Sequence, residues 1–382
     1  MLFKEIIGQE FIKKHLSASV EGNRVAHAQL FIGPSGSGVL PMAVAFAQYL
    51  ICADVPAEKE SARHSCNVKF KNLGHPDLHF AYPVATNSEI KSRPVSGSFA
   101  NQWREFYLKN PYGSLYDWYR YLGIEKKQGK IGKDEALEIG KSLSLKSYEG
   151  GHKVMIIWMA EKMNISASNK LLKLIEEPPK KTVFILIAED EDQIIDTIKS
   201  RCQLLHFPAL AEKAIEEALI NRENCELNLA KKIAHQANGS YSQALHILQE
   251  DGEEEEFETW FIAWVRTAFK AKGNKKAILE LISWSEEIAK KGRETQKGFL
   301  DFCVDFFRQA LMFNYKAPEL VYMVPKTKFD LSKFAPFVHG NNISEIVSEL
   351  QDAAYHIERN GNAKIILTDL SIKLTRLLHR KE

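Results

Sequence analysis

The sequence has no long apolar run and almost no net charge. No stretch approaches the roughly 18 consecutive apolar residues that span a bilayer, and the opening MLFKE does not have the pattern of a signal peptide. A formal net charge of +2 excludes the basic footprint of a chain that binds nucleic acid over its whole surface. We therefore expect a cytoplasmic protein whose contacts with DNA are local or shared with partners.

Cysteine is scarce as well. The five cysteines, an odd number, are scattered at Cys52, Cys66, Cys202, Cys225 and Cys303. This distribution is typical of reduced thiols and not of a disulfide framework. We expect the last three to be small buried residues, and Cys202 has no nearby pattern of His and Asn that would make it a nucleophile.

A glycine-rich segment, GPSGSGVL at residues 33–40, lies between an apolar strand pattern and an apolar helix pattern. This is the setting of a P-loop, whose backbone amides face a phosphate at a helix N-terminus. In the complete motif a Lys contacts the phosphates and a Ser or Thr holds Mg²⁺, but these positions are Val39 and Leu40. We therefore predict a degenerate nucleotide-binding loop, formed by Gly33, Gly36, Gly38, Val39 and Leu40.

Strand and helix patterns alternate as far as about residue 207, which is typical of a doubly wound α/β domain. Near-continuous apolar runs predict buried parallel strands at 153–157 and 183–187. A further strand is predicted at 75–80, and helices at 4–24 (a short pair), 133–145 and 164–176. The polar stretch from about 53 to 73 is interpreted as a solvated loop.

Residues 86–130 are expected to form an irregular insertion that is unusually rich in aromatic residues, Trp103 and Trp118 among them. Large rings are seldom left in water, so we expect this insertion to pack on the domain or on a neighbour. A platform on which the bases of single-stranded DNA stack is the alternative, because aromatic rings among Lys and Arg suit that role.

The strand patterns stop at about residue 209. Residues 210–250 read as a small helical unit, and residues 257–382 as a second helical domain, with the acidic run 253–256 as a linker or helix start. The sequence thus predicts three parts: an α/β domain at 1–208, a helical unit at 209–252 and a C-terminal helical domain at 253–382.

Four motifs in the first part carry a resemblance. They are HAQLFIGP at 27–34, HPD at 75–77, NKLLKLIEEPP at 169–179 and SRCQ at 200–203. Together they resemble the clamp-loader branch of the AAA+ proteins, and within it the delta-prime type of subunit of bacterial DNA polymerase III. The resemblance implies a fold of class α/β plus all-α, with an AAA+ doubly wound P-loop-type domain, a small helical lid and a C-terminal helical collar.

The chain departs from the active members of that family at three parts of the ATPase site. The strand after Lys153 leads to Trp158 and Met159, a degenerate Walker B motif without the acids for Mg²⁺ and water. Glu161 comes two positions too late, and we expect it to be a solvated residue at a turn. Ser242 occupies the lid position of an Arg. We therefore expect no ATPase activity of the chain's own.

One catalytic part of the family pattern is present. In clamp loaders the Arg of the Ser-Arg-Cys motif acts as an arginine finger in the nucleotide site of the next subunit. A guanidinium suits this role because it stays charged and offers a planar fork of donors. By resemblance, Arg201 is the finger, and Ser200 and Cys202 shape the turn that aims it.

Zinc is a further property that the resemblance raises. Related subunits usually bind zinc through four cysteines between the P-loop helix and the next strand, and Cys52 and Cys66 match the outer two. The inner two thiols are missing, and the spacing of His64 and His75 is wrong for a standard zinc knuckle. We therefore expect no bound metal.

The resemblance implies a non-hydrolysing scaffold subunit that helps to load the sliding clamp on primed DNA. Its partners would be gamma/tau and delta subunits, the sliding clamp and, through the complex, primer-template DNA; ATP and Mg²⁺ would be bound by neighbouring subunits. Two alternatives stay open, an active gamma/tau-type ATPase and an accessory module that binds single-stranded DNA through the insertion.

Overall fold

The computed structural model describes most of the chain. The residues it describes are 2–53, 60–125, 127–148, 151–249, 253–317, 321, 327 and 329–380. These residues form two units, one of Met1–Ile124 with Gln128–Ile247 and one of Glu125–Lys127 with Leu248–Glu382. The predicted boundary at residue 252 lies outside the described residues, and a separate lid remains a prediction.

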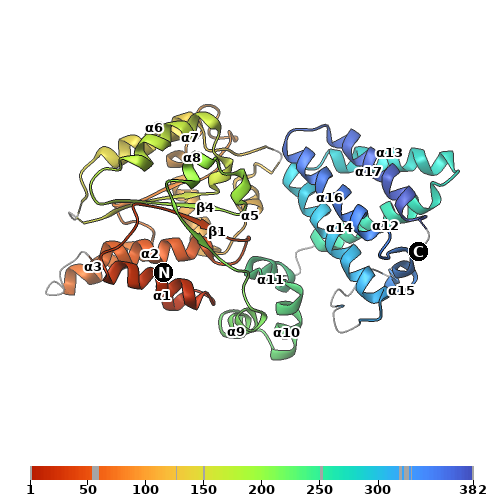
Figure 1. Cartoon of the computed structure of the whole chain (residues 1–382), viewed down its shortest axis with the longest axis horizontal. Helices are drawn as coiled ribbons and strands as arrows, with labels where there is room; N and C mark the ends of the chain where they lie inside the picture. Colours follow the sequence, from red (N-terminus) through yellow and green to blue (C-terminus); the bar gives the residue numbers. More distant parts are fainter. Residues whose placement is uncertain are drawn as a thin grey trace. The chain divides into compact units, whose positions relative to one another are not determined.

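A five-stranded parallel sheet lies at the centre of the first unit (Figure 1). Its strand order is β2-β3-β4-β1-β5. The two apolar runs form the inner strands β3 and β4, which are buried along their whole length, as predicted. The strands are β1 (Ala28–Ile32), β2 (Leu78–Ala81), β3 (Lys153–Trp158), β4 (Thr182–Ala188) and β5 (Gln203–His206).

Helices cover both faces of the sheet (Figure 1). One face packs against α1 (Glu10–Glu21), α2 (Val39–Ala53) and α3 (Glu60–Lys71), the other against α6 (Lys133–Ser144), α7 (Ile165–Glu176) and α8 (Asp196–Lys199). Side chains alternate along a strand, so Ile156 and Trp158 of β3 join the core on the α2 side, and Ile157 joins the opposite core.

The structure corrects two predictions of irregular structure. Residues 60–71 of the expected solvated loop form α3, because Cys66 and Phe70, one helical turn apart, are buried in the core. The aromatic insertion contains η2 (Ser96–Phe99), α4 (Ala100–Lys109) and α5 (Leu115–Leu122). The predicted helix pair at 4–24 is a 3₁₀ turn, η1 (Phe3–Glu5), followed by α1.

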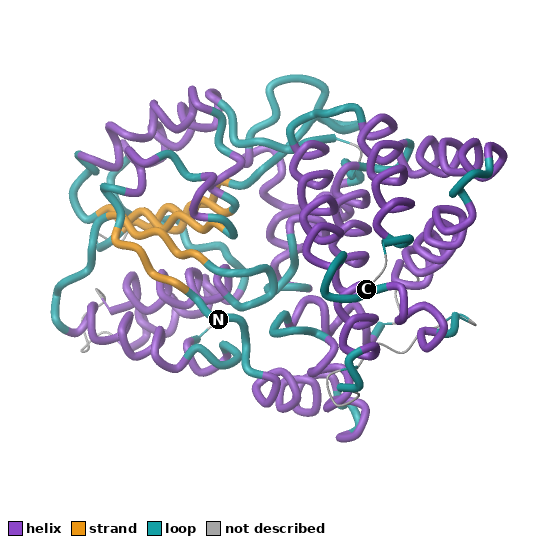
Figure 2. The backbone as a smooth tube through the Cα atoms, turned by 45° about the vertical axis from the view of Figure 1, so that its right-hand side comes forward, coloured by secondary structure: helices purple, strands orange, loops and turns teal. Residues whose placement is uncertain are grey.

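The first unit ends in three short helices, and the second unit is all-helical among its described residues (Figure 2). The three are α9 (Glu212–Glu223), α10 (Leu227–Gln236) and α11 (Tyr241–Leu248). The second unit contains α12 (Glu253–Lys270), α13 (Lys275–Ala289), α14 (Arg293–Asn314), α15 (Leu331–Phe334), η6 (Ala335–Phe337), α16 (Ile343–Glu358) and α17 (Ala363–Leu377). The predicted class, α/β plus all-α, is confirmed.

The core of the second unit is built from aromatic rings. Trp264 and Trp284 stack in parallel with ring centroids 5.1 Å apart, and Phe261 lies 4.2 Å from Phe306. These buried rings fix the helices of the bundle against one another. None of the described helices is long and apolar enough to cross a membrane.

Candidate functional site

The glycine-rich segment has the backbone of a P-loop. It connects β1 to α2, and Gly36 and Gly38 have φ angles of +74° and +92°, a region that favours glycine. The buried Ser37 donates its hydroxyl to the carbonyl of Pro34 at 2.7 Å. The strand–loop–helix arrangement of a P-loop is therefore present. The hydroxyl of Ser37 stabilises the loop by bonding to the loop's own backbone.

The chain's own residues lie directly against this loop. A Cβ added to Gly38 would lie 3.1 Å from Cε1 of Tyr112, and one added to Gly36 would overlap the Ser240 hydroxyl. The backbone amide of Tyr241, at the start of α11, donates to the Gly36 carbonyl at 3.1 Å. The insertion and the short helices thus meet the loop where a nucleotide would need room.

The cavity left at the loop is small. Its volume is about 30 Å³, enough for water but far below the several hundred Å³ of a small-molecule site. Val39 and Leu40 are each only 5% exposed and belong to the apolar core with Trp158 and Met159. The Trp158 ring packs 5.1 Å from the Trp103 ring of the insertion. An apolar cluster therefore fills the positions at which the sequence analysis expected the lysine and the Walker B acids to be missing.

Glu161 is only partly exposed, not solvated as predicted. It lies in the turn η3 (Ala160–Lys162), which packs on β4, and its Oε1 accepts a hydrogen bond from the Glu189 amide at 3.2 Å. Its Oε2 is buried without a hydrogen-bond partner among the described residues. Burial, and then the nearby charge of Glu189, raise the pKa of Glu161 to about 7. The side chain of Glu161 leaves the solvent because the turn η3 directs it toward the backbone at Glu189.

Replacing Glu161 with glutamine should stabilise the chain at pH 8 and change little at pH 5. The folded-state pKa is about 7 against an ordinary 4.5, so the folded state holds the proton more tightly and stability is lost as the pH rises through this window. The expected gain at pH 8 is on the order of 1–3 kcal/mol, a few degrees in Tm, measured by thermal unfolding at both values. The exposed Glu177→Gln is the control; an equal gain at both pH values would contradict the assignment.

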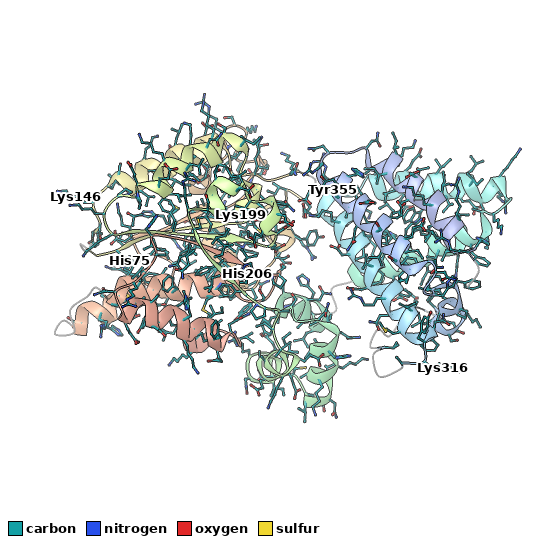
Figure 3. The ribbon with its side chains drawn as sticks, viewed as in Figure 1. His75, Lys146, Lys199, His206, Lys316 and Tyr355 are labelled. Carbon is teal, nitrogen blue, oxygen red and sulfur yellow. A yellow bond between two sulfur atoms is a disulfide. The ribbon has the colours of Figure 1, made fainter. Side chains whose placement is uncertain are left out.

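Arg201 lies in the turn between α8 and β5, flanked in the chain by Lys199 and His206, which Figure 3 labels. Its Nε lies 2.5 Å from Oε1 of Glu176, and its guanidinium donates to the Thr197 carbonyl at 2.8 Å. Arg201 is 37% exposed and Glu176 43%. Two of the sequence motifs therefore meet in space, because Glu176 ends α7.

The neighbours of Arg201 shape this turn. The Ser200 hydroxyl donates to the Thr197 carbonyl at 3.3 Å and accepts from Arg201 at 3.2 Å. Cys202 is partly buried, and burial raises the pKa of its thiol to about 11. A thiol that stays protonated at neutral pH is a packing residue and a poor nucleophile, in agreement with the sequence-based expectation.

Comparison with known proteins bears on both features. Residues 8–211 match the model of the family described as "DNA polymerase III, delta subunit". The chain belongs to this family. The DNA polymerase III subunit delta' of Bacillus subtilis is 31% identical over 243 residues, which are 64% of this chain and 60% of the relative.

The chain is also similar to proteins named as the tau subunit and as a gamma subunit-related protein of DNA polymerase III. The subunit tau of B. subtilis is 22% identical over 99% of this chain and 62% of its own length. A gamma subunit-related protein of Thermotoga maritima superposes with a TM-score of 0.37 at 14% identity, over 95% of this chain and 99% of its own. The chain spans about 60% of the length of the two B. subtilis relatives. The predicted resemblance to the delta-prime type is confirmed.

Two residues that the sequence did not single out, Asp117 and His246, form hydrogen bonds together with Ser242. Ser242, for which the lid-arginine position was predicted, donates its hydroxyl to Asp117 of the insertion at 3.2 Å, and His246 lies 2.8 Å from the same carboxylate. Burial opposes ionisation of Asp117, but hydrogen bonds from His246 and Ser114 outweigh it and lower the pKa of Asp117 below its ordinary value. A carboxylate of the chain itself thus anchors α11.

The sequence did contain one signal that could have drawn attention to Asp117. The spacing Ser114-x-x-Asp117 is that of a capping box, and it begins α5. Two rings of the insertion offer no stacking surface, because Trp103 is 2% exposed and Trp118 is fully buried; Tyr121 is exposed, and the role of the insertion in stacking bases stays a prediction. Both tryptophan rings face the core and contact each other edge to face at 5.2 Å. Rings enclosed in this way cannot receive bases.

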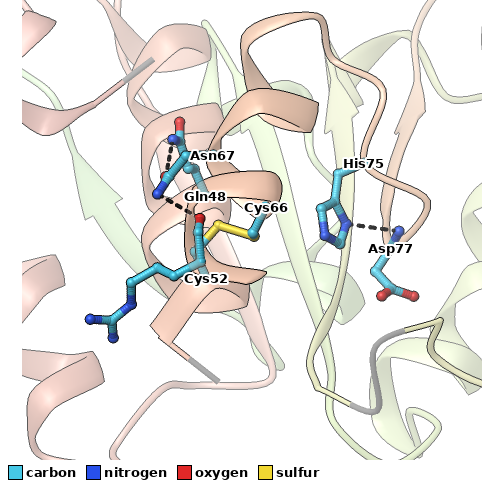
Figure 4. The surroundings of a disulfide bond; sticks show 7 residues. Gln48, Cys52, Cys66, Asn67, His75 and Asp77 are labelled. Carbon is cyan, nitrogen blue, oxygen red and sulfur yellow. Dashed lines mark hydrogen bonds between the residues drawn. A yellow bond between two sulfur atoms is a disulfide. The ribbon is translucent and has the colours of Figure 1, made fainter. Parts of the chain in front are cut away.

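Cys52 and Cys66 form a disulfide bond, which corrects the prediction that all five cysteines are reduced (Figure 4). The end of α2 and the middle of α3 place the two Cα atoms 5.9 Å apart, within disulfide reach. His75 stacks on Phe70 and accepts a hydrogen bond from the Asp77 amide at 3.2 Å. Within the described parts of the chain, no group of three His, Cys, Asp or Glu side chains could hold a metal ion.

Removing this bond should lower the thermal stability. The cysteines are 14 residues apart, and closing a loop of that size contributes about 3 kcal/mol in the chain-entropy model. The double variant Cys52→Ser/Cys66→Ser should lose several degrees in Tm, and a reductant should lower the wild-type Tm to a similar value without affecting the variant. Titration of five free thiols in the unreduced, unfolded protein would contradict the bond.

Proposed function

We propose that this chain is a non-hydrolysing subunit of the delta-prime type in the clamp loader of DNA polymerase III. One observation carries the proposal: the chain's own apolar side chains fill the nucleotide loop, whereas Arg201 lies at an exposed turn. A subunit of this kind cannot use ATP itself but can act on the ATP of a neighbour. It would be a cytoplasmic scaffold without a bound cofactor or metal.

Arg201 would supply the arginine finger in trans, with Ser200 and Cys202 shaping its turn. Its ion pair with Glu176 is exposed on both sides, and pairs of this kind contribute only about 0–1 kcal/mol. The guanidinium can therefore exchange Glu176 for phosphate oxygens at little cost. Phosphate oxygens, like those of a carboxylate, can accept two parallel hydrogen bonds from the planar fork of a guanidinium.

The partners of the proposed subunit are the gamma/tau and delta subunits, with the sliding clamp and primer-template DNA reached through the complex. The relatives named as delta' and tau subunits of DNA polymerase III support this placement. The active gamma/tau type is the second candidate, favoured by the tau relative, which matches nearly the whole chain. The apolar Val39, Leu40, Trp158 and Met159 disfavour it.

Two measurements test the proposal. Calorimetric titration of the full chain with Mg·ATP should show no binding at micromolar concentrations, because the loop has neither room nor charge for the nucleotide. Co-expression with tau and delta subunits should yield one complex that contains this chain. Micromolar binding of Mg·ATP would favour the active type, and a chain that never co-purifies with either subunit would refute the clamp-loader role.

A further inference from the structure

Two exposed aromatic rings and one half-buried ring gather on the second unit. Phe269, at the end of α12, is 41% exposed, and Phe337 of η6 is 36% exposed. The ring of His379, just after α17, stacks on Phe269 with an interplanar angle of 15° and centroids 4.7 Å apart. Phe337 contacts Phe269 edge to face at 4.7 Å. Rings that cluster on a surface, unlike single exposed rings, often mark an interaction site.

Buried polar contacts hold this cluster in place. The fully buried Asn342 donates its amide to the carbonyls of Phe337 and Leu377, at 2.8 and 3.1 Å. His339, also buried, contacts the Arg380 carbonyl through Nε2 at 3.0 Å. These bonds join the turn that carries Phe337 to the end of α17. The ring cluster is therefore a preformed surface.

The segments that meet here carry only positive charge. Residues 263–276 and 371–380 contain eight Lys and Arg residues and neither Asp nor Glu. Lys364, at the start of α17, pairs with Glu286 near the end of α13, so the two helices run antiparallel and the start of α13 lies beside the end of α17. Five exposed basic residues lie on the segments that carry or adjoin the rings, namely the end of α12 and the turn after it, the start of α13 and the end of α17. They are Lys270, Lys272, Lys275, Lys276 and Arg376.

Acidic partners neutralise other cations of the second unit but not these five. Arg380 pairs with Glu345 at 2.7 Å, and Lys373 pairs with Glu349 and Asp369. Among the described residues, none of the five bordering cations forms an ion pair. In a chain with a formal net charge of +2, this is a local excess of positive charge.

We propose that this basic aromatic surface, formed by the three rings and the five bordering cations, binds single-stranded nucleic acid. The cations would contact backbone phosphates, and the exposed parts of Phe269 and Phe337 would receive unpaired bases, which stack on aromatic side chains whatever their sequence. An acidic protein segment would use the charges but not the ring faces. A blunt duplex would leave the rings unused, because its bases are already stacked.

The test is the binding of fluorescein-labelled dT20 to the full chain, followed by fluorescence anisotropy between 50 and 200 mM salt. Five phosphate contacts on a single strand predict a slope of log K against log salt of about −3.5. A blunt 20-base-pair duplex should bind more weakly than dT20. This measurement uses the chain alone, so its outcome does not depend on a role in clamp loading.

The variants separate charge from stacking. Lys272→Glu/Lys275→Glu/Lys276→Glu, near a helix N-terminus that tolerates acids, should weaken binding at least tenfold. The matched reversal of exposed lysines, Lys213→Glu/Lys231→Glu/Lys232→Glu, should weaken it less than twofold. Phe269→Leu keeps the apolar contact but loses the ring and should weaken binding about five- to tenfold. Tyr355 is an exposed ring on α16, about 20 Å from the start of that helix (Figure 3). The variant Tyr355→Leu should therefore not weaken binding.

Four results would overturn the proposal. They are no salt-dependent binding of dT20, equal losses in both charge reversals, equal binding of single strand and duplex, and full binding by Phe269→Leu. Binding of a poly-glutamate peptide as tight as that of dT20, and unaffected by Phe269→Leu, would assign the surface to an acidic protein segment instead. Thermal unfolding of each variant confirms that it is folded.

Discussion

Replacing Arg201 with alanine should lower ATP hydrolysis by a reconstituted clamp loader about tenfold, while the loader still assembles and binds ATP. At a single site an arginine finger accelerates phosphoryl transfer about 10³- to 10⁵-fold; a tenfold loss for the assembly corresponds to sites that hydrolyse ATP in a coupled cycle, since independent sites would lose only the share of this one site. Stability should hardly change, because the pair of Arg201 with Glu176 is exposed. The measurement is the steady-state ATPase rate in the presence of clamp and primed DNA.

Three control variants distinguish a finger from a structural ion pair. Glu176→Gln removes the same intrachain pair but leaves the guanidinium, so it should keep nearly full ATPase activity. Arg201→Lys keeps the charge without the planar fork and should recover little activity. Lys199→Ala removes a neighbouring cation of the same turn and should have little effect. If Arg201→Ala and Glu176→Gln lowered Tm equally and left the ATPase rate unchanged, the finger role would be refuted.

Restoring the P-loop residues by Val39→Lys/Leu40→Thr should destabilise the chain and create no nucleotide site. Both positions are 5% exposed within the apolar core, and an uncompensated charge buried there costs about 3–5 kcal/mol. The cavity of about 30 Å³ leaves no room for the phosphates, and Trp158 offers no ligand for Mg²⁺. Thermal unfolding and calorimetric titration with Mg·ATP measure the two effects.

The matched control for this variant is Leu40→Met, which conserves volume in the same core and should cost less than about 1.5 kcal/mol. A stable Val39→Lys/Leu40→Thr chain that binds Mg·ATP at micromolar affinity would show that the loop is still a working site. If the variant does not bind Mg·ATP, the inability to bind nucleotide depends on more than these two residues. It then also depends on the packing of the insertion against the loop.

Much of the α/β unit could be predicted from the sequence because its signals are local. The apolar runs at 153–157 and 183–187 became β3 and β4, since a strand buried on both faces needs such a run. The helix predicted at 164–176 became α7, which Pro178 and Pro179 follow. For α3 the local signal was weak, because few of its residues are apolar and its burial depends on contacts with α2.

Contacts between residues far apart in the chain were not predicted. The Cys52–Cys66 bond depends on how two helices pack, and the burial of Glu161 depends on a turn that folds back on β4. Ser242 and His246 both contact Asp117, although they lie 125 and 129 positions after it in the chain. No spacing rule connects residues at such distances.

By itself, the sequence predicted which chemical groups the nucleotide loop lacks. By resemblance, Val39, Leu40, Trp158 and Ser242 are expected where an ATPase has a lysine, a hydroxyl, an acid and an arginine, and side-chain chemistry follows from residue type alone. Only the tertiary structure decided what occupies the site instead. Tyr112 and α11 lie against the loop, and Arg201 pairs with Glu176, because the fold brings distant segments together and packing fills the space.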